Sequence, residues 1–376
     1  MRRLISLWPL AILLLATTFS SCAVFKAPHR DLRPQEVPSA LSYADSLLAS
    51  SQLDSAKQLY SDVLNIGATC LRAIVGLGDV ALAEGDWNEA ARLGKRALGM
   101  DTTSLAARYL VAVGAREYGI SVQTPPSWIP GQKDFEWILA RDSSFRDVLY
   151  QYALLERYRN ECEHALELAH VQVRKRPTVD TLKVGLFKLS RYFMATQDSS
   201  SFLPLLRKHG GSIALYFQGE LLRRHDQRRT AESLFVQLLH DPGDLPPQAP
   251  YLSLARLRSV RGDATGAEQE YWKAVNSLDS PFGAAILFED LKYIVSDEEL
   301  EYYSRLKTVE EKRDFFRTFW GFRNPSPGSM SNRRLQEHIY RYTIAEQRYE
   351  YYGPRTYFTD PDVSGVLKRP KSFSLN

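Results

Sequence analysis

The sequence predicts an all-α fold, in which pairs of helices stack into a solenoid that is followed by a short helical module. Three observations predict it. Residues 72–100 carry small side chains where two helices of a pair would cross, and the same pattern occurs 34 residues earlier. Pairs of small residues 12 positions apart recur further along the chain. Two helix-start signals then follow beyond about residue 281.

Residues 72–100 define the register of the repeat. Gly78 and Ala90 fall where the two helices of the pair cross, and Gly85 falls near the turn between them. Ala56 lies 34 positions before Ala90, with Ala44 in the place of Gly78. Small side chains allow the close helix packing that these positions need. The residues predicted to pack in this way along the whole chain are Ala44, Ala56, Gly78, Ala90, Ala97, Ala153, Ala165, Gly219, Ala231, Ala255 and Ala267.

This pattern resembles the tetratricopeptide repeat, a two-helix unit of 34 residues. The resemblance rests on Gly78, Gly85, Ala90 and Ala97 and on the second copy in register with them. It implies a right-handed superhelix whose concave wall is lined by the first helix of each repeat. Proteins of this family usually hold extended peptides or partner helices against that wall.

Residues 38–120 are expected to form a first array of repeats. Helices are predicted near residues 39–50, 53–64, 70–83 and 87–98, and a further helix at 104–118 should cover the end of this array. Residues 121–133 interrupt the pattern. Pro125, Pro126 and Pro130 block helix continuation, so this segment is a loop or a boundary.

Residues 134–280 predict a second array. The 12-residue spacing recurs in three pairs: Ala153 with Ala165, Gly219 with Ala231, and Ala255 with Ala267. Residues 184–194 are apolar enough for another first helix, but the serine-rich segment after Asp198 carries no signature of a partner helix. We therefore expect about five recognisable repeats together with degenerate ones.

The N-terminal 22 residues have the features of a secretion signal. Arg2 and Arg3 precede an apolar run that is shorter than the roughly 20 residues needed to span a bilayer. Residues 19–22, Phe-Ser-Ser-Cys, resemble the bacterial lipobox, which implies that Cys22 becomes acylated. Ala23 after it suggests, by analogy, the outer membrane, with residues 23–37 as a proline-containing tether. The alternative is an ordinary signal peptide in which Cys22 has no role.

Residues 281–360 predict a C-terminal helical module. Ser296 with Glu299 and Thr308 with Glu311 form two capping boxes, each marking the start of a helix. The second helix carries an aromatic face that ends at Trp320, which either packs on the last repeat or forms a platform for a ligand. The aromatic residues of this face are Phe315, Phe316, Phe319 and Trp320.

Residues 298–357 resemble the start of a bacterial domain of unknown function that is named for a Gly-Trp-x-Thr-Asp motif. Thr359 and Asp360 retain the second half of that motif and the Gly-Trp half is absent, so the domain looks truncated before the tail at residues 361–376. The resemblance implies no known reaction. The residues that carry it are Phe316, Phe319, Trp320, Arg323, Asn324, Pro325, Pro327, Gly328, Asn332, Arg341, Ala345 and Tyr349.

A long helix is expected over residues 332–352. Its heptad spacing places a stripe of apolar and tyrosine side chains next to a row of arginines. This surface either grips a partner or sugar ring, or packs its tyrosines inward and leaves the arginines in solvent. The stripe is Leu335, Ile339, Tyr342 and Tyr349, and the row is Arg334, Arg341 and Arg348. The candidate partner-binding residues of the module are Trp320, Arg323, Arg341, Tyr342, Arg348 and Tyr349.

The composition is that of an ordinary folded protein, with 44% hydrophobic and 24% charged residues and a formal charge of +4. So small an excess of positive charge gives no argument for nucleic-acid binding. No nucleophile elbow, phosphate-binding glycine loop or His-Glu-x-x-His motif occurs. His164 and His170 lie on different faces of a helix, and Cys70 and Cys162 lie too far apart in sequence to imply a disulfide framework.

These observations predict a protein that is not an enzyme and that needs no metal or cofactor. The favoured function is a membrane-anchored scaffold or assembly factor of the bacterial envelope, which binds a protein or peptide in its concave groove. The alternative is a glycan- or peptide-binding component of envelope processing or nutrient uptake that uses the aromatic C-terminal module. The sequence does not distinguish the oligomeric state, the partner, or the side of the outer membrane.

Overall fold

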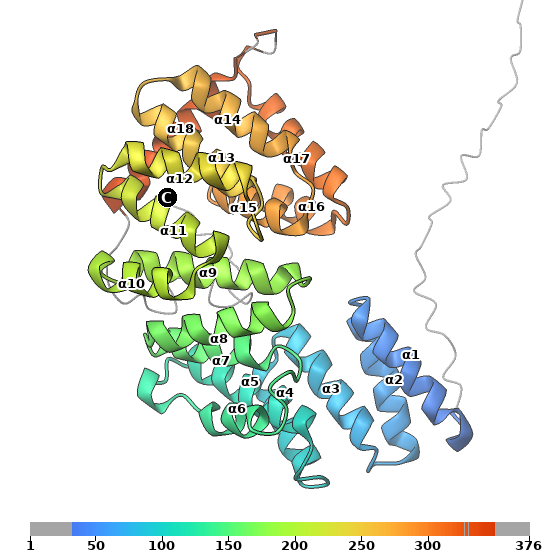
Figure 1. Cartoon of the computed structure of the whole chain (residues 1–376). Helices are drawn as coiled ribbons and strands as arrows, with labels where there is room; N and C mark the ends of the chain where they lie inside the picture. The colour runs from blue at the N-terminus through green and yellow to red at the C-terminus, as the bar shows by residue number, and fades with distance from the viewer. Residues whose placement is uncertain (1–31, 327, 330, 350–376) are drawn as a thin grey trace, which may run out of the picture.

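The computed structural model describes residues 32–326, 328, 329 and 331–349, and all regular structure in these residues is helical (Figure 1). Seven antiparallel helix pairs form a continuous stack, and four further helices complete the described chain. The pairs are α1 (Val37–Ala49) with α2 (Leu53–Ile66), α3 (Leu71–Glu84) with α4 (Trp87–Leu98), α5 (Leu105–Ser121) with α6 (Gln132–Leu139), α7 (Val148–Tyr158) with α8 (Cys162–Lys175), α9 (Asp180–Thr196) with α10 (Ser199–His209), α11 (Gly211–Arg224) with α12 (Arg228–His240), and α13 (Gln248–Val260) with α14 (Ala264–Asn276). The last helices are α15 (Pro281–Leu291), α16 (Asp297–Arg305), α17 (Val309–Phe322) and α18 (Arg333–Tyr349).

The first helices of successive pairs form one inner row. Each helix of the series α1, α3, α5, α7, α9, α11 and α13 packs on the next, and α15 continues the row after α13. α15 also contacts α9, three places back along the row. That contact requires the row to curve toward the side of the first helices, so their exposed face is the concave wall of a helical solenoid.

The small residues predicted to pack at the helix crossings lie in the core. Ala44, Ala56, Ala90 and Ala153 are fully buried, and the other predicted alanines are exposed by at most 1%. A Cβ at Gly78 would overlap the side chain of Leu110. A Cβ at Gly219 would lie 2.7 Å from Cε1 of Phe235, which is closer than carbon atoms approach.

The proline-rich segment lies inside one helix pair. Pro126–Trp128 forms a single 3₁₀ turn in the connection between α5 and α6, and both of these helices pack on α7. The stack therefore continues through residues 121–133, and the segment between α5 and α6 is a loop within a repeat rather than a boundary between two arrays. α5 with α6, and α9 with α10, are the degenerate repeats, and the remaining five pairs carry the recognisable pattern.

A helix was not indicated by sequence after Asp198, but α10 begins at Ser199. The Asp198 side chain accepts a hydrogen bond from the backbone N–H of Ser200 at 3.1 Å and so caps this helix. The serines that obscured the partner helix are therefore its start, where short polar side chains are favourable.

The C-terminal module begins its helices where the capping boxes predict. Ser296 Oγ accepts from the Glu299 N–H at 3.2 Å, and Glu299 Oε2 accepts from the Ser296 N–H at 2.8 Å. Thr308 and Glu311 make the equivalent pair of bonds at the start of α17. The aromatic face of α17 is buried where the helix packs on α14 and α15, which confirms the core interpretation of that face.

Several sequence predictions fall outside the described residues. They are the signal peptide and Cys22, most of the tether, the Thr359-Asp360 pair and the tail at 361–376. Within the described part of the chain, no helix combines the length and the apolar character needed to cross a bilayer.

Candidate functional site

The inner face of the first repeats contains an open hollow of about 390 Å³ between α1 and α3. Charged side chains lie at its edges, and small and apolar ones form its floor. The residues around it are Asp45, Leu48, Ala49, Tyr60, Arg72, Val75, Gly76, Asp79 and Arg146.

One edge of this hollow is organised around Asp45 on α1. Its carboxylate accepts a hydrogen bond from the hydroxyl of Tyr60 at 2.5 Å and forms an ion pair with Arg72 on α3. The Tyr60 ring is fully buried. Burial, together with the bond to the Asp45 carboxylate, raises the pKa of Tyr60 above its ordinary value, so the hydroxyl remains a donor.

The opposite edge is organised around Asp79 on α3. Both carboxylate oxygens of Asp79 accept from the Arg146 guanidinium, at 2.6 and 2.8 Å. Arg146 precedes α7, so this bidentate pair joins the second repeat to the fourth. The guanidinium also lies 5.0 Å from the centre of the Tyr109 ring, and the Tyr109 hydroxyl donates to Asp147 at 2.6 Å.

Arg146 holds a backbone conformation that side chains rarely adopt, with φ of 45°. Residues in this left-handed region cost on the order of 1 kcal/mol unless their surroundings compensate. The contacts of Arg146 with Asp79 and Tyr109 supply that compensation. The strained backbone therefore serves to aim a cationic side chain into the hollow.

The floor of the hollow is apolar and closely packed. Leu48 and Ala49 come from α1, and Val75 and Gly76 come from α3. A Cβ at Gly76 would overlap the Tyr60 ring, so glycine is needed for the ring to lie beneath the floor. The hollow can therefore accept an aliphatic side chain between two aspartate–arginine pairs whose charges remain within reach of solvent.

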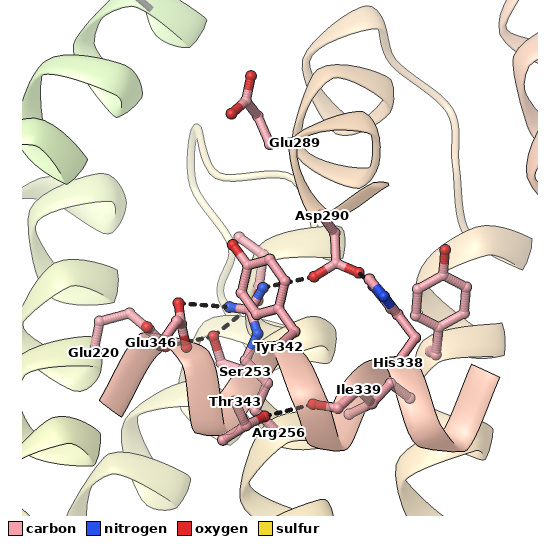
Figure 2. A network of polar contacts seen from close by, with 12 residues as sticks. Glu220, Ser253, Arg256, Glu289, Asp290, His338, Ile339, Tyr342, Thr343 and Glu346 are labelled. Carbon is pink, nitrogen blue, oxygen red and sulfur yellow. Dashed lines mark hydrogen bonds and ion pairs between the residues drawn. The ribbon is translucent and has the colours of Figure 1, made fainter. Parts of the chain in front are cut away.

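The inner face of the last repeats is occupied instead by α18 (Figure 2). Leu335 and Ile339 of this helix are exposed by 0% and 3%, and the helix packs on α13 and α14. The Tyr342 hydroxyl accepts a hydrogen bond from Arg191 on α9 at 3.0 Å, and Arg256 on α13 lies over the ring at 4.4 Å.

The side-chain carboxylate of Glu346 lies among buried arginines. Its Oε2 accepts from Nη2 of Arg223 on α11 at 2.8 Å, and its Oε1 lies 3.7 Å from Arg224 and 3.9 Å from Arg256. Burial alone would raise the pKa of Glu346, but the arginines, Arg256 foremost, hold it well below its usual range. The carboxylate is therefore ionised in the folded protein.

A second acid, Asp290 on α15, completes this network. Its two oxygens contact Arg256 Nη2 at 2.8 Å and His338 Nε2 on α18 at 2.9 Å (Figure 2). Burial opposes ionisation of Asp290, but the hydrogen bond from His338 and the charge of Arg256 lower its pKa below the ordinary value. The network thus ties α18 to both α13 and α15.

The structure corrects one predicted partner-binding residue, Trp320. Its side chain is 1% exposed, and its Nε1 donates to the hydroxyl of Tyr271 at 2.8 Å, so it belongs to the core between α17 and α14. The ring is covered because α17 turns its aromatic face toward the repeats. It offers no binding surface.

The other candidates of the module are dispersed. Arg323 pairs with Glu299 at 2.8 Å and covers the Phe319 ring. Arg341 is solvated and pairs with Glu337 at 2.6 Å, whereas Tyr342 points inward. The side chains of Arg348 and Tyr349 lie outside the described residues. The stripe of α18 therefore packs inward up to Tyr342 while Arg334 and Arg341 face solvent.

The described residues contain no group of histidine, cysteine and acidic side chains placed to hold a metal ion. His164 contacts Glu156 at 3.2 Å, and the rings of His170 and His209 stack with centres 4.5 Å apart. Burial raises the pKa of the Cys162 thiol to about 12, so it is protonated at neutral pH.

The sequence did not single out the charged residues of the open hollow, although it contained a signal for two of them. Asp45 and Asp79 are 34 positions apart, so they occupy the same place in successive repeats. Arg146 carried no such signal because it lies in a connection outside the repeat pattern.

No protein-family model matches this chain, and no curated protein matches it. Several solved structures are similar to parts of this chain at low identity. The MamA protein has 15% identity and a TM-score of 0.35, over 52% of this chain and 97% of that one. YrrB, described as a tetratricopeptide repeat protein with an unusual peptide-binding site, has 14% identity and a TM-score of 0.33, over 48% and 90%.

A tetratricopeptide repeat protein from Parabacteroides merdae has 11% identity and a TM-score of 0.39, over 75% of this chain and 98% of that one. Similarity at this level carries no argument about what this chain binds. The paired helices and their curved inner row themselves define the chain as an all-α, tetratricopeptide-like solenoid.

Proposed function

We propose that this chain is a scaffold or assembly factor that binds a segment of another protein in the open hollow between α1 and α3. One observation carries the proposal: successive repeats place Asp45 and Asp79 at equivalent positions, each paired with an arginine, on either side of an apolar floor. A stack of helices needs no such hollow for its own stability. In the last repeats, by comparison, α18 covers the inner face.

The chemistry of the hollow favours an extended peptide with an aliphatic side chain and a charged group next to it. The aliphatic side chain would cover Leu48, Ala49 and Val75. A carboxylate of the ligand would compete for Arg72, whose side chain is 53% exposed and therefore pairs only weakly with Asp45. A basic group of the ligand would compete in the same way for the carboxylates of Asp45 and Asp79.

The proposal includes attachment to the bacterial outer membrane through acylated Cys22. It is supported by the apolar run of residues 4–16, the small residues before Cys22 and the proline-containing tether at 23–37. Acyl chains at Cys22 would hold the solenoid at the membrane while the tether lets its inner face reach a partner.

In vivo crosslinking tests this function. A photoreactive amino acid at Ala49, which is exposed at the hollow, is expected to capture one or two envelope proteins. The matched control places the same residue at Lys95, which is exposed on α4, a second helix. Equal capture at both positions, or none at Ala49, would contradict binding in the hollow.

Mass spectrometry of the N-terminal peptide from the same preparation tests the anchor. An acylated peptide beginning at Cys22 is the expected result, and an unmodified Cys22 in the membrane-bound protein would contradict it. The glycan-binding alternative has lost its main support, since Trp320 lies in the core and Tyr342 faces Arg191 and Arg256.

A further inference from the structure

α18 lies along the inner face formed by α9, α11, α13 and α15, where a repeat solenoid would hold a partner's helix, and it also packs on α14, the second helix of the last pair. α18 reaches each of the four helices through a side-chain contact. The partners are Arg191 on α9, Arg223 on α11, Arg256 on α13 and Asp290 on α15.

The two halves of α18 differ in how deeply they are buried, although both make charged contacts, since His338 of the first half contacts Asp290. Leu335 and Ile339, in its first half, are buried apolar side chains. In its second half, Tyr342 and Glu346 lie among charged groups of the repeats. Tyr342 and Glu346 are only partly buried, whereas Leu335 and Ile339 are buried. The second half is therefore the part that conditions or a competitor can release first.

The groove orients its own charges without help from α18. Arg223 donates through Nε and Nη2 to Glu220 at 3.1 and 2.7 Å, and Ser253 donates to the same carboxylate at 2.6 Å. Arg256 is held by Asp290 on the neighbouring helix α15. Arg223 and Arg256 therefore each have an acidic partner in the groove besides the contacts that α18 makes.

The groove carries more positive than negative charge around the position of Glu346. The arginines that face this carboxylate or the adjacent Tyr342 are Arg191, Arg223, Arg224 and Arg256. Glu220 on α11 and Asp290 on α15 oppose them. Glu289 on α15 pairs with Arg191 and also with Lys188 and Lys292. A buried excess of positive charge is unfavourable, so the site requires an anionic occupant.

We propose that this groove is a second helix-binding site, occupied by α18 in cis, and that α18 competes there with a partner's amphipathic helix. The partner helix is expected to carry an aromatic residue followed four positions later by a carboxylate. That spacing reproduces Tyr342 and Glu346, which project from adjacent turns of one helix face. The proposal concerns a different surface from the hollow between α1 and α3.

The test measures binding of a fluorescent peptide with the sequence of residues 333–349 to the full-length chain. In the variant Ile339→Asp with Glu346→Arg, both changes lie on α18 and leave the groove's own side chains intact. We expect this variant to bind the peptide at least ten times more tightly than the wild-type chain does. Glu337→Gln is the matched control, because Glu337 pairs with Arg334 and Arg341 on the solvated side of α18.

A second peptide with Glu346→Arg is expected to bind neither chain. Equal binding of the two peptides by the variant, or binding of neither peptide while α9–α15 keep their hydrogen-exchange protection, would overturn the proposal. Loss of that protection directs the test to native-state hydrogen exchange of the wild-type chain in rising urea. Residues 342–349 should then exchange before residues 335–339, and simultaneous exchange of all of α18 with α13 would overturn it. The crosslinking experiment at Ala49 tests the hollow between α1 and α3 separately, so its outcome does not depend on either peptide-binding result.

Discussion

Two glycine-to-alanine substitutions test how closely the helices of the stack approach one another. A Cβ at Gly114 in α5 would lie 2.7 Å from the backbone oxygen of Trp87 and 2.8 Å from the backbone nitrogen of Ala91. A Cβ at Gly321 in α17 would have no neighbour within 4 Å. The same chemical change is therefore made once at a helix contact and once in open space.

The two substitutions should change stability in opposite directions. Alanine is favoured over glycine in a helix by about 1 kcal/mol, and nothing opposes that gain at Gly321. At Gly114 the obstructing atoms belong to the backbone and cannot turn away, so overpacking of about 1–3 kcal/mol applies. Because the same helix gain of about 1 kcal/mol offsets part of the overpacking cost, we expect Gly114→Ala to destabilise by up to about 2 kcal/mol and Gly321→Ala to stabilise by about 0.5–1 kcal/mol.

Urea unfolding of the full-length chain measures both changes, and hydrogen exchange locates them. Protection should fall in α4 and α5 of Gly114→Ala and stay unchanged in α13 and α14, because the perturbed contact joins only the first two of these helices. An equal gain in stability from both substitutions would refute the close approach of α4 and α5.

Three further predictions concern acid, the open hollow and the anchor. The pKa values of Glu346 and Asp290 lie below their unfolded-state values. Their contribution to stability is therefore present above about pH 4.3 and is lost as pH falls further. Acid titration followed by hydrogen exchange should show α18 losing protection first. Tyr60→Phe removes the hydrogen bond to Asp45 and should destabilise the first repeats by about 1 kcal/mol in thermal unfolding, and no change would contradict the role of that bond. Cys22→Ser should move the protein from the membrane fraction to the supernatant on fractionation, and retention in the membrane would count against the lipid anchor.

The sequence predicts the helix pairs well where packing requires a small residue at a fixed position. Gly78 and Gly219 leave no room for a Cβ beside Leu110 and Phe235. Each also lies 12 positions before an alanine of the same pair, so the sequence alone marks these positions. Capping boxes are equally local, which explains why the starts of α16 and α17 were predicted correctly. Such signals act within one turn or one crossing of two helices.

The degenerate repeats were harder to predict because their second helices lack those signals. α6 is short and follows a proline-rich loop, and its place in the stack depends on packing with α5 and α7. The contacts of Glu346 posed a greater difficulty. Arg223 is 123 positions from Glu346, and no local period relates residues on α9, α11, α13, α15 and α18. Only the curvature of the inner row brings them together.

The location of the open hollow follows from how the apolar core is divided. One large cluster of buried side chains extends from α5 to the C-terminal module, whereas α1 to α3 share a small cluster of their own. The first repeats therefore lie outside the large core, and a third, small cluster joins α3, α4 and α5. The Asp79–Arg146 pair is a direct tie between α3 and the connection before α7. A ligand carboxylate that draws Arg146 away would also release this tie, so binding in the hollow and movement of the first repeats are expected to be coupled.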